Sequence, residues 1–192
     1  RANNEDSFLL CDLVRAKSLQ DTYVLERELT SCRLLMVVSD GVGGSHLGEL
    51  ASELTVLTIK DALLNIDPSI DVAHRVTAAV EQANHIVFTE NKRSPRLAGM
   101  KATSTLVLIE ADQAYIANVG DSRCYLIHNG EISQVTIDQT LGEILLSQGV
   151  LTAEQVARHP KRNVIVQAIG NSNTLQVPIT RLRLSIGDRL LL

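Results

Sequence analysis

Apolar positions along the chain form short strand-like runs, which two long stretches with helical spacing interrupt. Runs at residues 8–14 and 34–38 predict buried strands, and a weaker alternation over 22–28 predicts one more. Apolar side chains recur at helical spacing over 47–66 and 72–87, which predicts two amphipathic helices. Each helix therefore needs a sheet or another helix to cover its apolar face.

The pattern then returns to short strands. Four runs, at 103–110, 113–119, 123–128 and 131–136, are separated by tight turns such as Asn129-Gly130. An Asn-Gly pair between alternating runs is a strong hairpin signal. The four runs therefore predict an antiparallel meander.

Residues 138–161 turn helical again, and Thr152–Gln155 has the pattern of a capping box. Ser45 is the N-cap candidate of the first long helix. Strands resume at 164–169 and 175–184. This order of elements predicts an α+β fold, in which helices pack on the outer faces of antiparallel sheets.

Composition narrows the possible partners. With 192 residues, 45% of them hydrophobic, the chain fits one ordinary globular domain. A net charge of −4 and an aromatic content of 3% argue against binding to nucleic acid or an anionic membrane. Cys11, Cys32 and Cys124 lie in apolar stretches without CxxC spacing, so we expect buried thiols in a reducing compartment.

Candidate chemistry begins at Ser39–Gly44, where a buried run leads into Asp40 and three glycines. Glycine allows the backbone to approach a ligand closely, so carbonyl and amide groups can reach an ion. Glu5 and Asp6 form a second acidic pair before the first predicted strand. Either group alone is better explained as a solvated turn. Together they suggest a metal site, because hard divalent cations prefer carboxylate and carbonyl ligands.

Two alternatives stay open at these motifs. Gly120–Arg123 either forms an ordinary hairpin turn or brings Asp121 to the same sheet edge as Asp40. Gly41–Gly44 could instead bind a phosphate through the amides of a helix N-terminus. The chain has no GxxxxGK[ST] pattern, and no Lys follows the glycines, which argues against a nucleotide-binding loop.

Several motifs follow one another along the chain, namely Arg1-x-x-Asn4-Glu5-Asp6-Ser7, Ser39–Gly44, Gly99-Met100 with Ser104–Val107, and Gly120–Arg123. Further on lie Asp138-Gln139-Thr140, His159-Pro160-x-Arg162-Asn163-Val164 and Ala168-Ile169-Gly170. In this order the first set resembles the metal-dependent protein phosphatase family (PPM, type 2C), and the second set resembles its bacterial branch. The likeness covers essentially the whole chain, and the order of the motifs makes it specific.

The resemblance implies a four-layer α-β-β-α sandwich, in which helices flank two antiparallel sheets. It implies a single catalytic domain over 1–192 that is truncated at both ends, because the family's N-terminal strand and two C-terminal aspartate motifs are missing. A flap subdomain is expected at 138–162, where a basic cluster consists of Arg158, His159, Lys161 and Arg162. That cluster either complements the dipole of a surface helix, which is the simpler explanation, or docks acidic phosphoproteins.

For the metals, the resemblance implies two Mn²⁺ or Mg²⁺ ions, with a third in bacterial relatives. Asp40 is expected to bridge the first two ions, and Glu5 and the Gly41 carbonyl to bind one of them. Asp6 is expected to act through bound water, and Asp121 to contribute to the third ion.

The implied reaction is hydrolysis of phosphoserine and phosphothreonine in proteins by in-line attack of a metal-bridging hydroxide. Arg1 matches an arginine that contacts the substrate phosphate, and its planar fork suits two phosphate oxygens. We expect phosphoproteins made by a Ser/Thr kinase as partners, and a cytoplasmic monomer that binds neither nucleic acid nor membrane. The alternative is a catalytically incomplete regulatory or binding domain of the same fold. A phosphoesterase that acts on small molecules is a third possibility.

Two positions depart from the family pattern. Val42 stands where many eukaryotic relatives carry a histidine that is proposed to protonate the leaving group. Residues 101–103 replace a glycine that usually follows Gly-Met, a change expected to alter only a local turn. Because the two C-terminal aspartates are missing, we expect this chain alone to hydrolyse p-nitrophenyl phosphate poorly or not at all.

Overall fold

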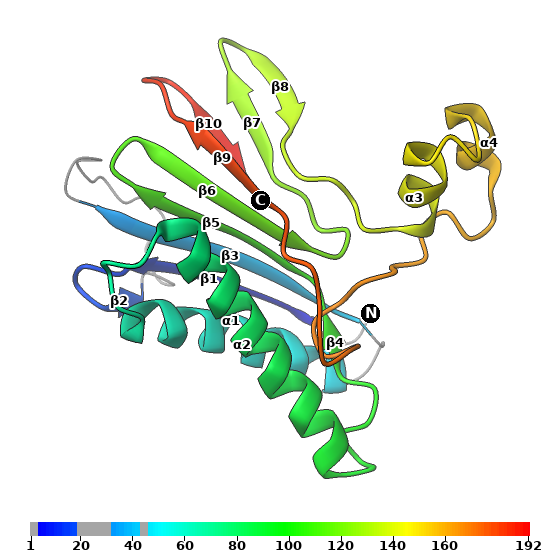
Figure 1. Ribbon diagram of the computed structural model, residues 1–192, viewed down its shortest axis with the longest axis horizontal. Coiled ribbons are helices and arrows are strands. Elements are labelled where there is room, and N and C mark those ends of the chain that lie inside the picture. The colour runs from blue at the N-terminus through cyan, green and yellow to red at the C-terminus, as the bar shows by residue number, and fades with distance from the viewer. Residues whose placement is uncertain (1–3, 19–31, 43–45) are drawn as a thin grey trace.

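The computed structural model describes residues 4–18, 32–42 and 46–192, which form helices and two antiparallel sheets (Figure 1). In spatial order, the large sheet contains β2 (Lys17–Ser18), β1 (Asp6–Asp12), β3 (Arg33–Val42), β5 (Ser104–Glu110), β6 (Gln113–Val119) and β9 (Ile179–Arg183), with β4 (Lys101–Ala102) paired to β3. The small sheet contains β10 (Arg189–Leu191), β7 (Tyr125–His128) and β8 (Glu131–Gln134). The helices are α1 (His46–Asn65), α2 (Val72–Arg93), α3 (Leu141–Ser147) and α4 (Ala153–Arg158).

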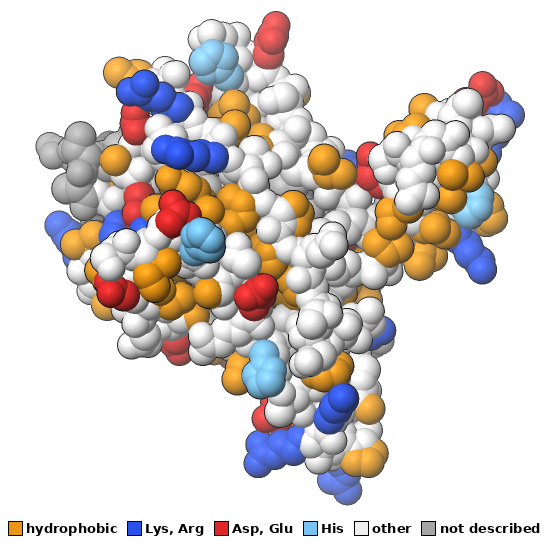
Figure 2. Space-filling view, in the orientation of Figure 1, with side chains coloured by type: hydrophobic (Ala, Val, Ile, Leu, Met, Phe, Trp, Pro, Cys, Tyr) orange, Lys and Arg blue, Asp and Glu red, His pale blue; other side chains and the backbone are white. Residues whose placement is uncertain are grey.

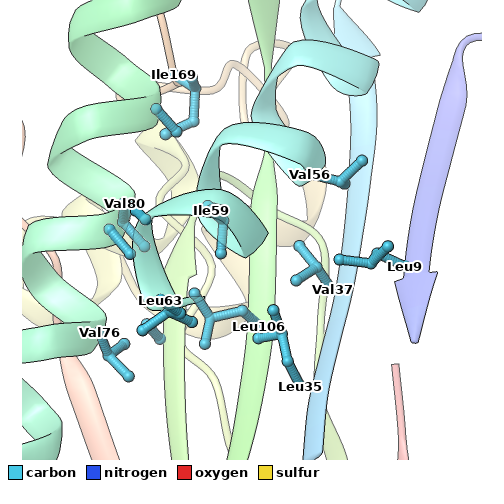
Figure 3. Packing of buried hydrophobic residues seen from close by; sticks show 14 of the residues in the cluster. Leu9, Leu35, Val37, Val56, Ile59, Leu63, Val76, Val80, Leu106 and Ile169 are labelled. Atoms are coloured by element: carbon cyan, nitrogen blue, oxygen red, sulfur yellow. The ribbon is translucent and has the colours of Figure 1, made fainter. Parts of the chain in front are cut away.

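One face of the large sheet packs against α1 and α2, as the apolar pattern predicted. Because side chains alternate along a strand, Leu35 and Val37 of β3 and Leu106 of β5 all point to this face. Figure 3 shows them meeting Ile59 of α1 and Val80 of α2 in the main hydrophobic core. The two long helices are therefore held on the sheet by their apolar stripes.

The other face of the large sheet packs against the small sheet. Met36 of β3 and Val107 of β5 belong to a second apolar cluster, together with Cys124 and Leu190 from the small-sheet region. The α+β class, with two packed antiparallel sheets and helices, is confirmed. This sandwich brings the ends of β1 and β3 close to the turn that leads into β7.

Helices α3 and α4 lie in an arm, defined as residues 138–162, which projects to one side of the sheets (Figure 1). The predicted capping box at the start of α4 is confirmed, because Thr152 and Gln155 each bond to the other's backbone N–H. Of the helices in the described ranges, none is both long enough and apolar enough to cross a lipid bilayer.

The predicted meander over 103–136 is wrong, because the chain changes sheets after β6. Strands β5 and β6 pair in the large sheet, whereas β7 and β8 pair in the small one. Gly120 has a φ of +103°, which a glycine adopts without strain, and the turn it opens leads the chain across to the small sheet. Cys124 is fully buried just beyond this turn and anchors the crossing.

The strand predicted at 164–169 is also wrong, because the chain there makes only isolated bridges. The strand predicted at 175–184 is shortened to β9. The strand expected at 22–28 and the N-cap expected at Ser45 lie outside the described residues.

Candidate metal centre

Two aspartates lie directly opposite each other where β1 begins. Asp6 of β1 pairs with Asp40 of β3 in the antiparallel register, and side-chain alternation turns both toward the small sheet. Strand β3 is longer than the predicted run at 34–38 and continues past Asp40 to Val42. Both aspartates are exposed and line a cavity of about 480 Å³, as do Ser122 and Arg123.

The charge on this pair favours a bound cation. Like charges directly opposite each other destabilise a sheet. A divalent cation near Asp6 and Asp40 would replace that repulsion with two attractions, and carboxylate oxygens are the ligands such ions prefer. The register of β1 and β3 therefore brings together two groups that a metal would stabilise.

Beside the aspartates, Gly41 of β3 is in backbone contact with Gly48 in the first turn of α1. A Cβ on Gly41 would stand 2.2 Å from the Gly48 carbonyl oxygen, so only glycine permits this approach. Glu5 is buried, and its carbonyl accepts hydrogen bonds from the Gly41 N–H and the Ser52 hydroxyl. A Cβ on Gly48 would stand 2.5 Å from Glu5 Oε2 and 3.0 Å from the Gly41 carbonyl oxygen. These two candidate ligands are therefore neighbours beside α1.

Thr103, which is fully buried, connects β3 to the Gly120–Arg123 turn. The Asp40 N–H donates to Thr103 Oγ1 at 2.9 Å, and the Thr103 N–H donates to the Asp40 carbonyl at 2.8 Å. Thr103 Oγ1 also lies 2.7 Å from Ser122 Oγ. Residues 101–103 thus lie at the site itself, because Lys101 and Ala102 pair with β3 and Thr103 joins two candidate motifs.

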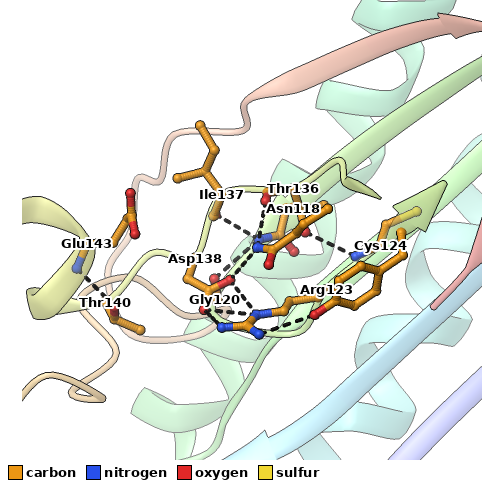
Figure 4. Close-up of polar contacts among 11 residues, drawn as sticks. Asn118, Gly120, Arg123, Cys124, Thr136, Ile137, Asp138, Thr140 and Glu143 are labelled. Carbon is orange, nitrogen blue, oxygen red and sulfur yellow. Dashed lines mark hydrogen bonds and ion pairs between the residues drawn. The ribbon is translucent and has the colours of Figure 1, made fainter. Parts of the chain in front are cut away.

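The Gly120–Arg123 turn holds Asp121 half-buried, next to a residue that lines the cavity. Burial raises the pKa of the Asp121 carboxyl, and the nearby Asp138 carboxylate acts in the same direction. Arg123 donates to both carboxylate oxygens of Asp138, at distances down to 2.6 Å (Figure 4). A cation bound at Asp121 would favour the charged carboxylate and offset the effect of burial.

The candidate site residues that the structure describes offer the type of donor atom that a hard divalent cation prefers. Asp6 and Asp40 face the cavity, whereas Glu5 lies beside the Gly41 carbonyl near α1. Carboxylates and a carbonyl are the oxygen donors that Mg²⁺ and Mn²⁺ select. Within the described ranges, no three or more His, Cys, Asp or Glu side chains are grouped closely enough to hold a metal.

The structure relates the predicted site residues to one another in three ways. It brings Asp6 together with Asp40, and Glu5 together with the Gly41 carbonyl. Asp121 is connected to Asp40 indirectly, through Thr103 and the residue after Asp121. Arg1, Gly43 and Gly44 lie outside the described residues.

Thr103 was not identified from the sequence, and neither was the position of Arg123 at the cavity. A threonine at the start of a strand is too common to attract notice. Its hydroxyl becomes significant only because the fold brings Asp40 and Ser122 to it from distant parts of the chain. Arg123 was noted only as part of a motif, and its place on the cavity wall follows from the change of sheets after β6.

The sequence matches known proteins over most of its length. A family model described as protein phosphatase 2C matches residues 13–175. Serine/threonine protein phosphatase PstP of Mycobacterium tuberculosis is 32% identical over 180 residues, which cover 94% of this chain and 33% of that protein. Protein phosphatase PhpP of Streptococcus pneumoniae is 33% identical over 190 residues, which cover 96% of this chain and 75% of PhpP. The chain thus spans about a third of the first relative and three quarters of the second.

Solved structures of similar proteins share the fold. The crystal structure of the M. tuberculosis phosphatase PstP/Ppp matches with a TM-score of 0.77 and 30% identity, over 99% of this chain and 71% of that one. The PstP catalytic domain in complex with two manganese ions matches with a TM-score of 0.73 and 29% identity, over 99% of this chain and 70% of that one.

Proposed function

The chain belongs to the protein phosphatase 2C family, and we propose that its protein hydrolyses phosphoserine and phosphothreonine in other proteins with the help of divalent metal ions. The observation that carries this proposal is the pair Asp6 and Asp40, opposed across β1 and β3 and lining one cavity. The structural relative that holds two manganese ions supports Mn²⁺ or Mg²⁺ as the ions.

Each residue of the proposed centre has a distinct role. Asp40 would bridge two ions, Glu5 and the Gly41 carbonyl would bind one of them, and Asp6 would hold a water of the metal shell. When bound, such ions supply an activated water and neutralise charge on the phosphoryl oxygens. Close packing of Gly41 on Gly48 fixes the carbonyl, because neither backbone can move without the other.

Two further roles complete the proposal. Asp121 would contribute to a third, weaker ion, for which its half-buried carboxylate is suited once a cation is present. Arg1 would hold the substrate phosphate through its planar fork of donors. The arm would be a flap subdomain within the single catalytic domain.

The proposed partners are phosphoproteins that a Ser/Thr kinase has modified. We place the protein in the cytoplasm as a monomer, and one observation favours the location. Cys11, Cys32 and Cys124 are all buried free thiols. Such thiols are typical of a reducing compartment.

The test of this function is hydrolysis by the full-length protein in the presence of Mn²⁺. We expect release of phosphate from a phosphoserine peptide and from p-nitrophenyl phosphate, and loss of both activities when EDTA removes the metal. A lack of activity across Mn²⁺, Mg²⁺ and Co²⁺ would contradict the proposal and favour a regulatory or binding domain. Turnover of phosphorylated metabolites but not of phosphopeptides would favour a small-molecule phosphoesterase.

The basic cluster of the arm gives a prediction about protein substrates. Figure 2 shows apolar and cationic side chains on the arm, away from the body. Arg158 is paired with Glu154 at 2.8 Å on the surface, so its replacement should change stability little. We expect Arg158→Glu with Lys161→Glu to lower kcat/KM on an acidic phosphoprotein by roughly 3–10-fold, because rim charges steer association. Hydrolysis of p-nitrophenyl phosphate should not change.

The matched control reverses two cations at the end of α2, Lys92→Glu with Arg93→Glu. This pair changes the net charge equally but lies outside the arm, and we expect near wild-type rates on both substrates. Equal losses on the phosphoprotein from both double variants would attribute the effect to net charge and rule out docking on the arm.

A further inference from the structure

The arm joins the sheets through a short backbone ladder that ends at Gln139. The Leu141 N–H donates to the Val164 carbonyl at 2.9 Å, and the Gly142 N–H donates to the Arg162 carbonyl at 3.0 Å. Nearest the sheets, the Val166 N–H donates to the Gln139 carbonyl at 2.9 Å. These bonds close the base of the arm and join Gln139 to the same hydrogen-bonded ladder as the start of α3.

Gln139 forms hydrogen bonds with both the backbone N–H and the backbone carbonyl of Gly120. The Gln139 N–H donates to the Gly120 carbonyl at 2.9 Å, and the Gly120 N–H donates to Gln139 Oε1 at 2.9 Å. Gln139 Nε2 donates to the Asn118 carbonyl at 3.3 Å. Gln139 thus bonds to both backbone groups of Gly120, which a neighbouring strand would do in a sheet. Gly120 is the residue directly before Asp121.

The neighbouring residue holds the other end of the turn. The single N–H of Arg123 Nε is shared between the two carboxylate oxygens of Asp138, and Arg123 Nη2 donates to one of them (Figure 4). Asp138 and Gln139 are adjacent, so Gly120 and Arg123 are tied to the same short piece of the arm base. Asp121 lies between these two ties.

A second glutamine holds the amide of Gln139 in place. Gln167 Nε2 donates to Gln139 Oε1 at 3.0 Å, and Gln167 is itself fixed by Gln176, to whose carbonyl it donates and from whose N–H it accepts. These three glutamines also line a cavity of about 250 Å³ at the base of the arm. The Gln139 rotamer therefore depends on how the arm base sits on segment 167–176.

On the opposite side, the turn meets the proposed metal residues. A Cβ on Gly120 would stand 2.7 Å from Thr103 Cγ2, so Gly120 is packed directly on Thr103. Thr103 in turn bonds to the backbone of Asp40. The turn that carries Asp121 is thus held between Thr103 and Gln139. Of these two residues, Gln139 belongs to the arm and Thr103 does not.

We propose that Gln139 is a positioning residue, which sets the place of the Asp121 carboxylate and makes metal binding there depend on the arm. This inference rests on the proposed function, because it takes Asp121 as a ligand of the weaker third ion. A glutamine is required because its amide accepts from Gly120 and donates to Asn118 at once. A side chain of similar size without these groups fills the space but leaves the Gly120 N–H without its acceptor.

The test compares Gln139→Met with Gln148→Met in the full-length protein. Gln148 caps α3 on the same arm and is exposed, so the control makes the same chemical change away from Gly120. Mn²⁺ binding is measured calorimetrically without substrate. The weak step of the isotherm is binding of the third, weaker ion, and Asp121→Asn is the reference for its loss. We expect Gln139→Met to weaken the weak step by about 10-fold, the lower end for residues that orient a metal ligand. The tight steps and the Gln148→Met isotherm should match wild type.

Gln167→Met provides a second variant in case Gln139→Met does not fold, and it should shift the weak step in the same direction by less. If Gln139→Met leaves the weak step unchanged, the inference is overturned, whereas the proposed function is not. Equal weakening of tight and weak steps would also overturn it, because that result indicates general loosening. A wild-type isotherm without any weak step would instead remove the proposed role of Asp121, and the inference with it.

Discussion

We expect Asp40→Asn to lower kcat/KM of the full-length protein on a phosphoserine peptide by about 10³-fold with Mn²⁺ present. Asp40 faces the cavity opposite Asp6 and is the residue proposed to bridge two ions. Loss of a bridging carboxylate forfeits several kcal/mol of charge stabilisation in the transition state, and about 4 kcal/mol corresponds to this factor. Steady-state kinetics over a range of Mn²⁺ concentrations measures the effect.

The stability of the same variant separates a metal role from a structural one. Asparagine keeps the size of the side chain and removes the like-charge repulsion with Asp6, so metal-free Asp40→Asn should not be markedly less stable than wild type. The rise in melting temperature that Mn²⁺ produces in the wild type should be lost. Asp61→Asn, an exposed carboxylate of α1, is the matched control and should behave as wild type. A metal-free Asp40→Asn that is clearly less stable would assign Asp40 a structural role instead.

We expect Gly41→Ala to destabilise the metal-free protein by about 3 kcal/mol, the upper end for overpacking in a well-packed region. The added Cβ would meet the carbonyl oxygen, carbonyl carbon and Cα of Gly48, all of them backbone atoms that cannot rotate away. Strand β3 and helix α1 must then separate, which also moves the Gly41 carbonyl. Urea unfolding in EDTA measures the loss of stability, and calorimetry measures the loss of Mn²⁺ affinity.

Gly48→Ala probes the same contact from the helix. Its Cβ would stand 2.5 Å from the end of the Glu5 side chain and 3.0 Å from the Gly41 carbonyl oxygen, whereas alanine gains about 1 kcal/mol of helix propensity. We therefore expect a smaller loss of stability than from Gly41→Ala, together with a weaker Mn²⁺ site, because Glu5 is displaced. Equal destabilisation by the two variants would contradict the described packing.

The parts of the fold that follow from local pattern were predictable. Alternation along β3 and β5 separates Leu35 and Leu106, which meet the helices, from Met36 and Val107, which meet the small sheet. The Asp-Gly motif at Asp40 was identified because three glycines after a buried run are rare. The distance between Glu5 and Gly41 could not be predicted, since it depends on how α1 settles on the sheet.

Contacts between residues far apart in the chain could not be predicted from the sequence. Nothing local shows that the chain leaves the large sheet at Gly120, so the meander was the simplest prediction. Arg75 is only 2% exposed and forms a bidentate pair with Glu110, although charged helix residues usually face water. The hydrogen bond between Gln139 and Gly120 likewise joins residues that only the completed fold brings together.

The central claim is that Asp40, near the end of β3, holds metal ions. Anomalous scattering from crystals of the full-length protein grown with Mn²⁺ tests it directly. We predict two manganese peaks about 3.5–4 Å apart, both bonded to the Asp40 carboxylate, with the Gly41 carbonyl bonded to one of them. Manganese peaks that leave Asp40 without a bond to metal would contradict the account.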